Sequence, residues 1–304
     1  MKAALLPDRG VVKVAGDGAR NFLHGLVTAD ILKLAPGAAR FCALLTPQGK
    51  IIADFIVVEA PPPQDGKDGD FFLDIPRSLS APLVGKLNLY KLRAKVLIED
   101  LSDTLGVLAT WNVDMGGAGT TTIGLTYVDP RLPALGRRIM LPPHQAPAAA
   151  AELGAEPAAA GDYDAHRIAL GVPQGGADFA YGDAFPHETD MDQLGGVDFD
   201  KGCYIGQEVV SRMQHRGTAR TRAVPVRYDG TAPAPGTPVT AGDRQLGTLG
   251  SAAGGHAVAL LRLDRVDEAL VQGETLAADK TPIRLVKPDW ARFPFPGEFK
   301  KAAE

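Results

Sequence analysis

Cysteine, aromatic side chains and long apolar runs are all scarce in this sequence. Two cysteines, Cys42 and Cys203, occur in 304 residues, too few for a disulfide framework. The apolar runs fall well short of the roughly 18 residues that a membrane helix needs. The opening MKAALLPDRG has no signal-peptide core. We therefore expect a cytoplasmic protein in a reducing compartment, with no membrane partner.

Metal-binding clusters and an excess of basic charge are also missing. No CxxC or HxxH pair occurs, so we expect no metal site built by this chain alone. The formal net charge of −4 argues against strong nonspecific binding of the whole molecule to nucleic acid. Direct nucleic-acid binding is therefore not expected, although a local basic patch is not excluded.

The length and the pattern of elements favour an α+β protein of several domains. A chain of 304 residues is too long for one ordinary core. Helices and strands are mixed in the first two-thirds without a regular βαβ alternation. After Ala223, short β runs are divided by glycine and proline, which is typical of a small barrel or sandwich.

Several elements can be placed from the pattern alone. Residues 40–60 predict a hairpin that turns around Pro47-Gln48-Gly49. Asp17 is expected to cap a helix, and Ser80 is expected to cap another, with Pro82 in its first turn. A further helix should run from Gln207 to about His215.

The segment DFDKGCYIGQEVVSRMQHRG, residues 198–217, places Cys203 just before that helix. A helix N-terminus and a nearby cation such as Lys201 both favour a thiolate. Gly202 and Gly206 would allow backbone N–H groups to approach an anion or ligand. The alternative is a free cysteine buried as a small apolar side chain. We interpret Cys42, within an apolar strand, as core.

Four arginines follow closely in the sequence: Arg212, Arg216, Arg220 and Arg222. One interpretation is a solvated helix end and linker. The other is an anion site for a carboxylate tail or a phosphate. The sequence leaves both interpretations open.

The octapeptide KGCYIGQE, which comprises Lys201, Gly202, Cys203, Tyr204, Ile205, Gly206, Gln207 and Glu208, resembles the signature of the YgfZ-type folate-binding proteins. That family includes the mitochondrial factor that helps to mature [4Fe–4S] proteins. It is related to the aminomethyltransferase, or T-protein, of the glycine cleavage system. The segments GVVKVAGDGARNFLHGLVTADI, YKLRAKVLIED, HRIALGVPQGGADF and GDRQLGTLGSA occur in the family's order, so the resemblance covers nearly the whole chain.

The resemblance implies a monomeric three-domain ring of the T-protein type. A discontinuous α+β folate-binding domain would comprise residues 1–46 and 160–222. A second α+β domain would comprise residues 47–159. Residues 223–304 would form a C-terminal β-barrel domain and tail.

The resemblance also implies a tetrahydrofolate site. Asp54 matches an aspartate near the reacting nitrogens of the folate, and Phe41 matches an aromatic residue of the same pocket. Tyr163 falls where relatives carry an aromatic near the pterin, Glu188 matches a Pro-x-Glu segment, and Arg216 suits the glutamate tail. The alternatives are hairpin core for Phe41, an exposed strand position for Asp54 and helix packing for Tyr163.

Cys203 stands where the T-protein has an acidic residue, which favours an accessory protein over an enzyme. The implied function is a tetrahydrofolate-binding factor that supports assembly or repair of iron–sulfur clusters in client enzymes, including tRNA-modifying ones. Cys203 would be the working thiolate, as a redox group or as a ligand of a transient cluster shared with an assembly protein or client. One alternative is a folate-dependent aminomethyl transferase that uses Asp54. Another is a binding module for RNA or a protein.

Overall fold

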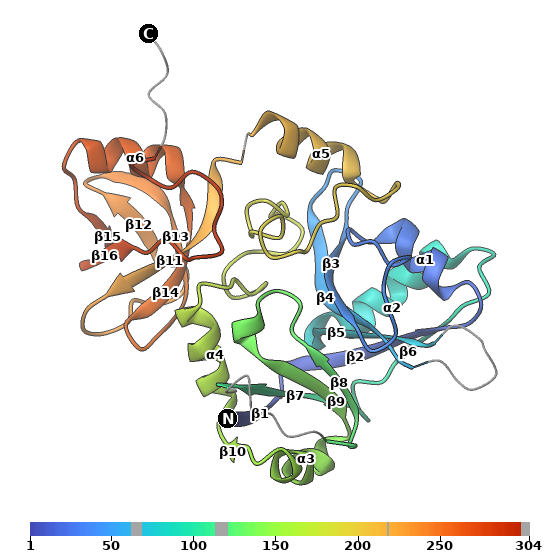
Figure 1. Cartoon of the computed structure of the whole chain (residues 1–304). Helices are drawn as coiled ribbons and strands as arrows, with labels where there is room; N and C mark the ends of the chain where they lie inside the picture. Colours follow the sequence, from blue (N-terminus) through green and yellow to red (C-terminus); the bar gives the residue numbers. More distant parts are fainter. Residues whose placement is uncertain (62–68, 113–120, 218, 299–304) are drawn as a thin grey trace. The chain divides into compact units, whose positions relative to one another are not determined.

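The computed structural model describes residues 1–61, 69–112, 121–217 and 219–298 (Figure 1). These residues form two compact units. The first unit comprises Met1–Tyr163 and Leu194–Gln207, and the second comprises Asp164–Gln193 and Glu208–Glu304. The predicted division into three domains stays a prediction.

The first unit contains a five-stranded sheet in the order β3-β4-β5-β2-β6. Helices α1 (Ala19–Leu26) and α2 (Arg77–Lys91) cover one face of this sheet, because their apolar side chains share one core with alternate residues of its strands. The strands are β2 (Arg9–Ala15), β3 (Ala39–Leu45), β4 (Ile51–Glu59), β5 (Phe71–Pro76) and β6 (Leu97–Asp100).

A second five-stranded sheet, in the order β10-β1-β7-β9-β8, completes the first unit. Alanines of α3 (Ala146–Glu152) pack with apolar residues of β1, β7 and β9 to form its own core. Strand β7 contacts β2 of the other sheet. The strands are β1 (Lys2–Leu6), β7 (Gly106–Trp111), β8 (Leu125–Val128), β9 (Arg137–Leu141) and β10 (Glu156–Pro157).

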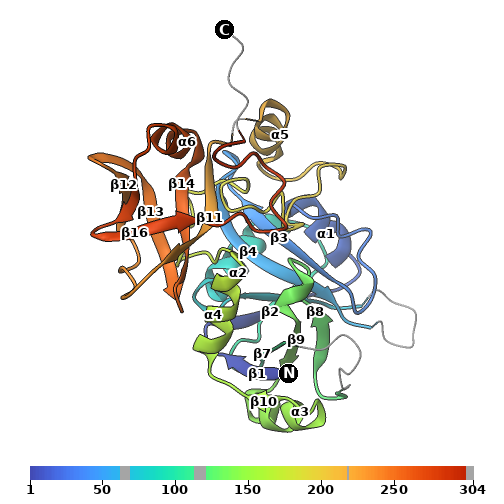
Figure 2. The ribbon, with the colours of Figure 1, turned by 60° about the vertical axis from the view of Figure 1, so that its left-hand side comes forward.

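The second unit contains a closed six-stranded barrel in the order β11-β14-β13-β12-β15-β16 (Figure 2). Helix α6 (Leu263–Val271) contributes Leu263, Val266 and Ala269 to the barrel core. The strands are β11 (Thr221–Tyr228), β12 (Pro238–Ala241), β13 (Arg244–Ala253), β14 (His256–Arg262), β15 (Leu276–Ala278) and β16 (Thr281–Leu285). The barrel predicted after Ala223 is therefore confirmed.

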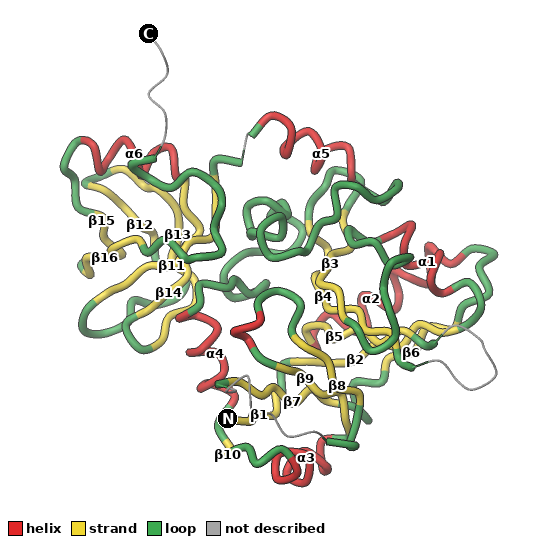
Figure 3. The backbone as a smooth tube through the Cα atoms, in the orientation of Figure 1, coloured by secondary structure: helices red, strands yellow, loops and turns green. Residues whose placement is uncertain are grey.

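Two further helices, α4 (Ala160–Ala169) and α5 (Gln207–Arg216), flank a long irregular stretch. Figure 3 shows this stretch, residues 171–206, as a continuous run of loop and turn. The α+β class is confirmed, and so is a helix that begins at Gln207. In the described part of the chain, none of the helices has the length and apolar character needed to cross a bilayer.

Three details of the predicted helices are wrong. Helix α1 has Gly18, not Asp17, at its N-cap, and no side chain caps it. Helix α2 begins at Arg77, directly after β5, so Pro82 is its sixth residue and not part of its first turn. Ser80 lies within α2, where its hydroxyl donates to Asp100. Helix α6 was not predicted, because its apolar residues continue the pattern of β14.

Candidate functional site

Residues 198–206, here called the thiol loop, carry Cys203 to the surface of the first unit. The side chain of Cys203 is exposed. Cys42, in β3, is completely buried in the helix-covered core of the first sheet. Burial raises the pKa of the Cys42 thiol well above its usual range, so this cysteine stays an inert thiol. The interpretation of Cys203 as a small buried side chain is therefore wrong.

Lys201 attaches the thiol loop to the end of α1. Its ammonium group donates hydrogen bonds to the carbonyl oxygens of His24 and Val27, each at 2.6 Å. These carbonyls lie at the C-terminal end of the helix, where a cation is favoured by the dipole. Partial burial lowers the pKa of Lys201 to about 8. Lys201 therefore holds the loop in place besides providing a charge near Cys203.

The two glycines of the motif have different reasons to be glycine. Gly206 has φ of +82°, and a Cβ atom there would lie 2.5 Å from the carbonyl oxygen of Thr46 in the β3–β4 turn. Any side chain at this position would meet both backbone strain and a backbone clash. At Gly202 a Cβ would only make an ordinary contact, 3.7 Å from Nε2 of His24. Gly206 is thus required by the fold, and Gly202 is not.

Tyr204, Ile205 and Gln207 complete the frame of the thiol loop. The backbone N–H of Tyr204 donates to Oε1 of Gln207 at 3.2 Å, which ties the loop to the start of α5. Tyr204 is buried, and burial raises the pKa of its hydroxyl to about 12. Ile205 packs against the core of the first unit. The motif residues around Cys203 thus have structural contacts, while Cys203 and Glu208 are exposed to solvent.

His24 is a neighbour of the thiol loop that sequence reasoning missed. Its Nδ1 lies 3.2 Å from Oδ1 of Asp30, and its Nε2 faces Gly202, the residue before Cys203. Burial, followed by the charge of Lys201, lowers the pKa of His24, so the imidazole is neutral at pH 7. Its position nearly 180 residues earlier in the chain gave no local signal.

Phe41 and Asp54 lie on the face of the first sheet that points away from the helices. Phe41 pairs with Ile56, and Ala43 pairs with Asp54, so these four side chains share one face. Cys42 and Phe55, which alternate with them, point into the helix-covered core. Phe41 and Asp54 are therefore diagonal neighbours, and they are 6% and 9% exposed. Asp54 is not the exposed strand residue that one interpretation expected.

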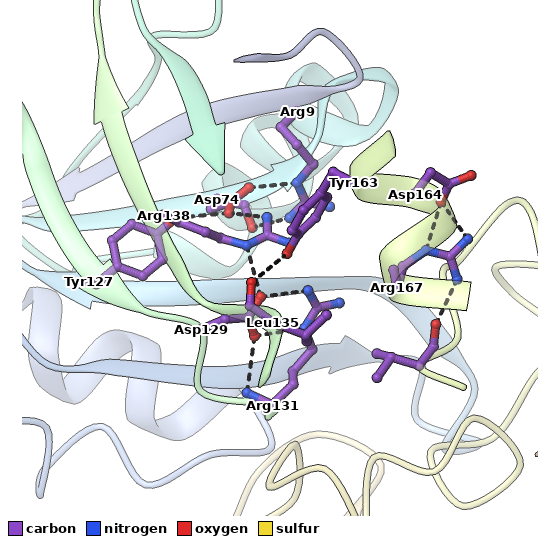
Figure 4. Close-up of polar contacts among 11 residues, drawn as sticks. Arg9, Asp74, Tyr127, Asp129, Arg131, Leu135, Arg138, Tyr163, Asp164 and Arg167 are labelled. Atoms are coloured by element: carbon purple, nitrogen blue, oxygen red, sulfur yellow. Dashed lines mark hydrogen bonds and ion pairs between the residues drawn. The ribbon is translucent and has the colours of Figure 1, made fainter. Parts of the chain in front are cut away.

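A buried network of charges lies on this same face (Figure 4). Oxygens of Asp74 accept hydrogen bonds from Arg9 at 2.6 Å, Arg138 at 2.7 Å and Tyr127 at 2.8 Å. Asp74 pairs with Ile56 in the sheet register, which places it beside the Asp54 strand. The network therefore connects residues of both sheets of the first unit.

Asp129 extends the network toward Phe41. It accepts hydrogen bonds from Arg138 at 2.9 Å and from Arg131 at 2.7 Å. Burial alone would raise the pKa of Asp129, but Arg131 and Arg138 outweigh it and hold this pKa well below its usual range. The guanidinium of Arg131 lies 5.7 Å from the centre of the Phe41 ring. Arg9, Arg131 and Arg138 thus face Asp74 and Asp129, and Asp54 is a third carboxylate on the same face.

Tyr163 joins the same network through its hydroxyl group. The hydroxyl lies 3.3 Å from Nη2 of Arg138, and the ring stacks edge-on against Trp111 at 5.3 Å between centroids. These contacts agree with the packing role that was the alternative for Tyr163. The structure therefore brings Phe41, Asp54 and Tyr163 to one charged region of the first unit.

The remaining predicted residues, Glu188 and Arg216, belong to the second unit. Glu188 accepts a hydrogen bond from the backbone N–H of Phe185 at 2.9 Å. It lines a cavity of about 420 Å³ together with Arg212, Arg220 and Arg262. Arg216 is exposed in the last turn of α5. The cavity supplies positive charge, but Arg216 is not among its lining residues.

Arg222 is different in kind from the arginines with which it was grouped. It is buried, donates to Asp192 at 2.6 Å and 3.0 Å, and donates to the carbonyl of His187 at 2.7 Å. Its guanidinium also lies 4.5 Å from the ring of Phe293. Neither the solvated interpretation nor the anion site fits Arg222, which stabilises the loop before α5 against the barrel.

Among the residues that the structure describes, no group of three or more His, Cys, Asp and Glu side chains could hold a metal ion. A cluster at Cys203 would consequently need ligands from another molecule, since one thiolate falls short of the usual four.

The fold is that of an aminomethyltransferase. The chain superposes on the glycine cleavage system aminomethyltransferase T from Bartonella henselae with a TM-score of 0.72 and 16% identity, over 97% of this chain and 87% of that one. Residues 220–293 match the family model of the CAF17 C-terminal beta-barrel domain. The predicted T-protein type of fold with a C-terminal barrel is confirmed.

The sequence relatives define the family more narrowly. The chain is 32% identical over 311 residues to the mitochondrial iron-sulfur cluster assembly factor IBA57 of Mus musculus, covering 94% of this chain and 84% of the mouse protein. It is 36% identical over 239 residues to the IBA57 homolog of Mycosarcoma maydis, covering 75% of this chain but only 57% of that protein. The chain belongs to the IBA57 family of iron–sulfur cluster assembly factors.

One expectation is overturned by these relatives. The sequence favoured a cytoplasmic location, but the IBA57 proteins of Mycosarcoma maydis, Pyricularia oryzae and Mus musculus are mitochondrial. The family therefore points to mitochondria instead. The expectation rested on scarce cysteine and on the absence of a signal-peptide core, and neither observation bears on mitochondrial import.

Proposed function

We propose that the chain supports the assembly or repair of iron–sulfur clusters in client enzymes, with Cys203 as the working thiolate. The observation that carries this proposal is the construction of the thiol loop. Lys201, Tyr204, Gly206 and Gln207 fix the loop by contacts with the rest of the first unit. They leave the Cys203 side chain at the surface, where another molecule can reach it.

The cluster in this proposal is cargo that passes between proteins. A single exposed thiolate can serve as one ligand while the assembly protein or client enzyme supplies the others. His24 lies beside Gly202 and is neutral at pH 7, so its imidazole is a further nitrogen donor close to the thiol loop. Clients that modify tRNA belong to the same proposal.

A purified assay tests the Cys203 role. An apo [4Fe–4S] enzyme is reactivated by a cluster donor in the presence of wild-type chain, Cys203→Ala or Cys42→Ala, with thermal unfolding as the folding control. We expect faster reactivation with wild type and with any folded Cys42→Ala, and no acceleration with Cys203→Ala. Equal acceleration by Cys203→Ala would remove the thiol from the proposal.

The second element of the proposal is a tetrahydrofolate derivative bound over β3 and β4 of the first unit. The Phe41 ring suits a flat pterin, the Asp54 carboxylate suits its aminopyrimidine N–H groups, and nearby guanidinium groups suit an anionic tail. Bound folate would supply a one-carbon carrier. Tyr163 of the same unit is proposed as a further contact, and the roles of Glu188 and Arg216 stay predictions.

Calorimetric titration with tetrahydrofolate tests this element. Asp54→Asn keeps the shape of the side chain and removes its charge, and Asp198→Asn in the thiol loop is a matched control. We expect weaker binding by Asp54→Asn alone. Unchanged binding would move the folate away from β4, and no binding by wild type would end the folate proposal.

Aminomethyl transfer is a second candidate function, favoured by Asp54 within an aminomethyltransferase fold. It predicts methylene-tetrahydrofolate, with release of ammonia and the lipoyl dithiol, when the chain is given tetrahydrofolate and an aminomethyl donor such as an aminomethylated lipoyl protein. Persistent absence of this product, with folate binding intact, would leave the accessory role.

A further inference from the structure

A cavity of the second unit gathers arginines that the proposed function does not use. Arg212 of α5, Arg220 before β11 and Arg262 at the end of β14 all line this cavity of about 420 Å³, which we call the arginine cavity. Small-molecule sites in proteins have volumes of roughly 300–1,000 Å³, so its size is that of a ligand site. The sequence left open whether its arginine segment binds an anion, and the arginine cavity is where two of those arginines meet.

One wall of the arginine cavity is a face of α5. Val209, Arg212 and Met213 are three and four residues apart, so they lie on the same side of this helix. Val209 and Met213 are half-buried, whereas Arg212 is exposed. Phe185, also half-buried, adds an aromatic ring from the long irregular stretch. The cavity therefore joins an apolar surface to a guanidinium group.

Another wall is the start of β11 beside the end of β14. Thr221 pairs with Arg262 in the sheet register. The backbone N–H of Leu263 donates to the carbonyl oxygen of Arg220 at 2.8 Å, which fixes the chain just before β11. The side chains of Arg220 and Arg262 are 70% and 34% exposed. Paired backbone thus positions two guanidinium groups that a ligand in solution can reach.

Positive charge exceeds negative charge in the arginine cavity. Asp264 is shared, because it pairs with Arg262 at 2.8 Å and lies 3.7 Å from Arg220. Glu188 is the carboxylate among the lining residues. In the described part of the chain, Arg212 has no carboxylate within ion-pair distance. Counted over the lining residues and their ion-pair partners, three guanidinium groups meet two carboxylates.

Charged neighbours on the two helices do not change this balance. On α5, Glu208 and Arg216 each lie four residues from Arg212, on either side of it. On α6, Arg265 and Glu268 also carry opposite charges. Each helix thus adds one charge of each sign around the cavity. One excess positive charge therefore remains for a ligand to neutralise.

We propose that the arginine cavity binds a small molecule with an apolar body and one oxyanion end group, a carboxylate or a phosphate. The oxyanion accepts hydrogen bonds from Arg212 and Arg220, since a planar guanidinium group matches both kinds of oxyanion. The apolar body lies against Phe185, Val209 and Met213. This ligand is separate from the tetrahydrofolate that we place over β3 and β4 of the first unit.

A nucleic-acid strand is a weaker fit to the arginine cavity. A strand is held by several phosphate contacts along a basic surface, whereas the lining residues and their ion-pair partners leave a single positive charge. The formal net charge of the whole chain, −4, also opposes such binding. A small anion needs only the local excess of charge.

Calorimetric titration of the full chain at low salt tests the proposal. Phenyl phosphate and benzoate carry the two oxyanions on the same ring, benzyl alcohol has the ring without the charge, and inorganic phosphate has the charge without the ring. We expect one of the two ring-bearing anions to bind at least about tenfold more tightly than benzyl alcohol and inorganic phosphate. The tighter of the two identifies the oxyanion. Absence of binding by both ring-bearing anions would overturn the proposal.

Arg212→Gln tests the place of binding, and Arg227→Gln is its matched control. Arg227 is an exposed arginine of β11 that does not line the cavity. We expect Arg212→Gln to weaken binding of the preferred probe about tenfold and Arg227→Gln to leave it unchanged, with equal thermal unfolding of both variants. Equal weakening would overturn the proposal, because the probe would then respond to overall charge. Displacement of the probe by saturating tetrahydrofolate would also overturn it, because the cavity would then belong to the folate site.

Discussion

The two candidate regions of the first unit are stabilised by different kinds of contact. The thiol loop is fixed by contacts with backbone groups around an exposed side chain, with Lys201 and Gly206 as its anchors. The face that carries Phe41 and Asp54 is fixed by buried charges, centred on Asp74 and Asp129. A surface group that meets a partner can be presented at small energetic cost. A buried polar face requires that nearly every charge has its counter-charge.

The largest expected effect comes from breaking the buried network. Asp74→Asn removes the charged partner of Arg9 and leaves Arg138 with Asp129 alone, and it should cost about 3–5 kcal/mol in the free energy of unfolding. Urea denaturation measures this cost. Asp103→Asn is the matched control, because Asp103 pairs with Arg77 but its side chain is 97% exposed. A small effect at both positions would show that the network is not buried in solution.

The next largest effect on the free energy of unfolding is expected at Gly206, whereas Gly202 should show almost none. Gly206→Ala must adopt φ of +82° and meet the carbonyl of Thr46, so it should cost about 1–3 kcal/mol. Gly202→Ala has room for its methyl group and should be close to neutral. Denaturation compares the two variants, and alkylation of Cys203 reports on loop order. Equal costs would mean that the loop is not held against the β3–β4 turn.

A smaller effect is the change in folding stability with pH that Lys201 causes. Its pKa is lowered from 10.5 to about 8 in the folded chain, so the unfolded chain binds more protons between these values. The unfolding free energy of wild type, measured relative to Lys201→Met, should therefore rise as pH increases from about 8 to about 10.5. A relative stability that falls in this window would contradict the buried position of the ammonium group.

The smallest expected effect is that of Cys203→Ala on stability. An exposed side chain away from packing contacts should change the free energy of unfolding by less than about 0.5 kcal/mol. Cys42→Ala, in the core, should cost more because it leaves a cavity. Chemical denaturation of both variants measures the difference. A large loss at Cys203 would indicate that its thiol packs within the loop.

The local sequence pattern was enough to predict the hairpin, the helix at Gln207 and the barrel. Each of them follows from alternating apolar residues, from turn residues or from residues that end a helix. It was also enough to single out Cys203 and the motif around it. The network of Arg9, Asp74 and Arg138 was not predicted, because its members come from strands distant in sequence and no local spacing joins them. His24 was missed for the same reason.

The two interpretations of the arginine segment show a further limit. Arg222 and Arg220 are two residues apart, yet Arg222 is buried and paired while Arg220 is largely exposed. Arg222 lies within β11, whereas Arg220 precedes the first residue of this strand, so only Arg222 is buried by the barrel. Sequence proximity alone could not decide which arginine faces a ligand.

Restoration of client activity in cells tests the central claim most directly. Cells that lack the protein are supplied with wild type, Cys203→Ala or Gly202→Ala at equal abundance, and the activity of a [4Fe–4S] enzyme is measured. We expect that wild type and Gly202→Ala restore this activity and that Cys203→Ala, folded and able to bind tetrahydrofolate, does not. Full restoration by Cys203→Ala would contradict the claim that the exposed thiol is the working group.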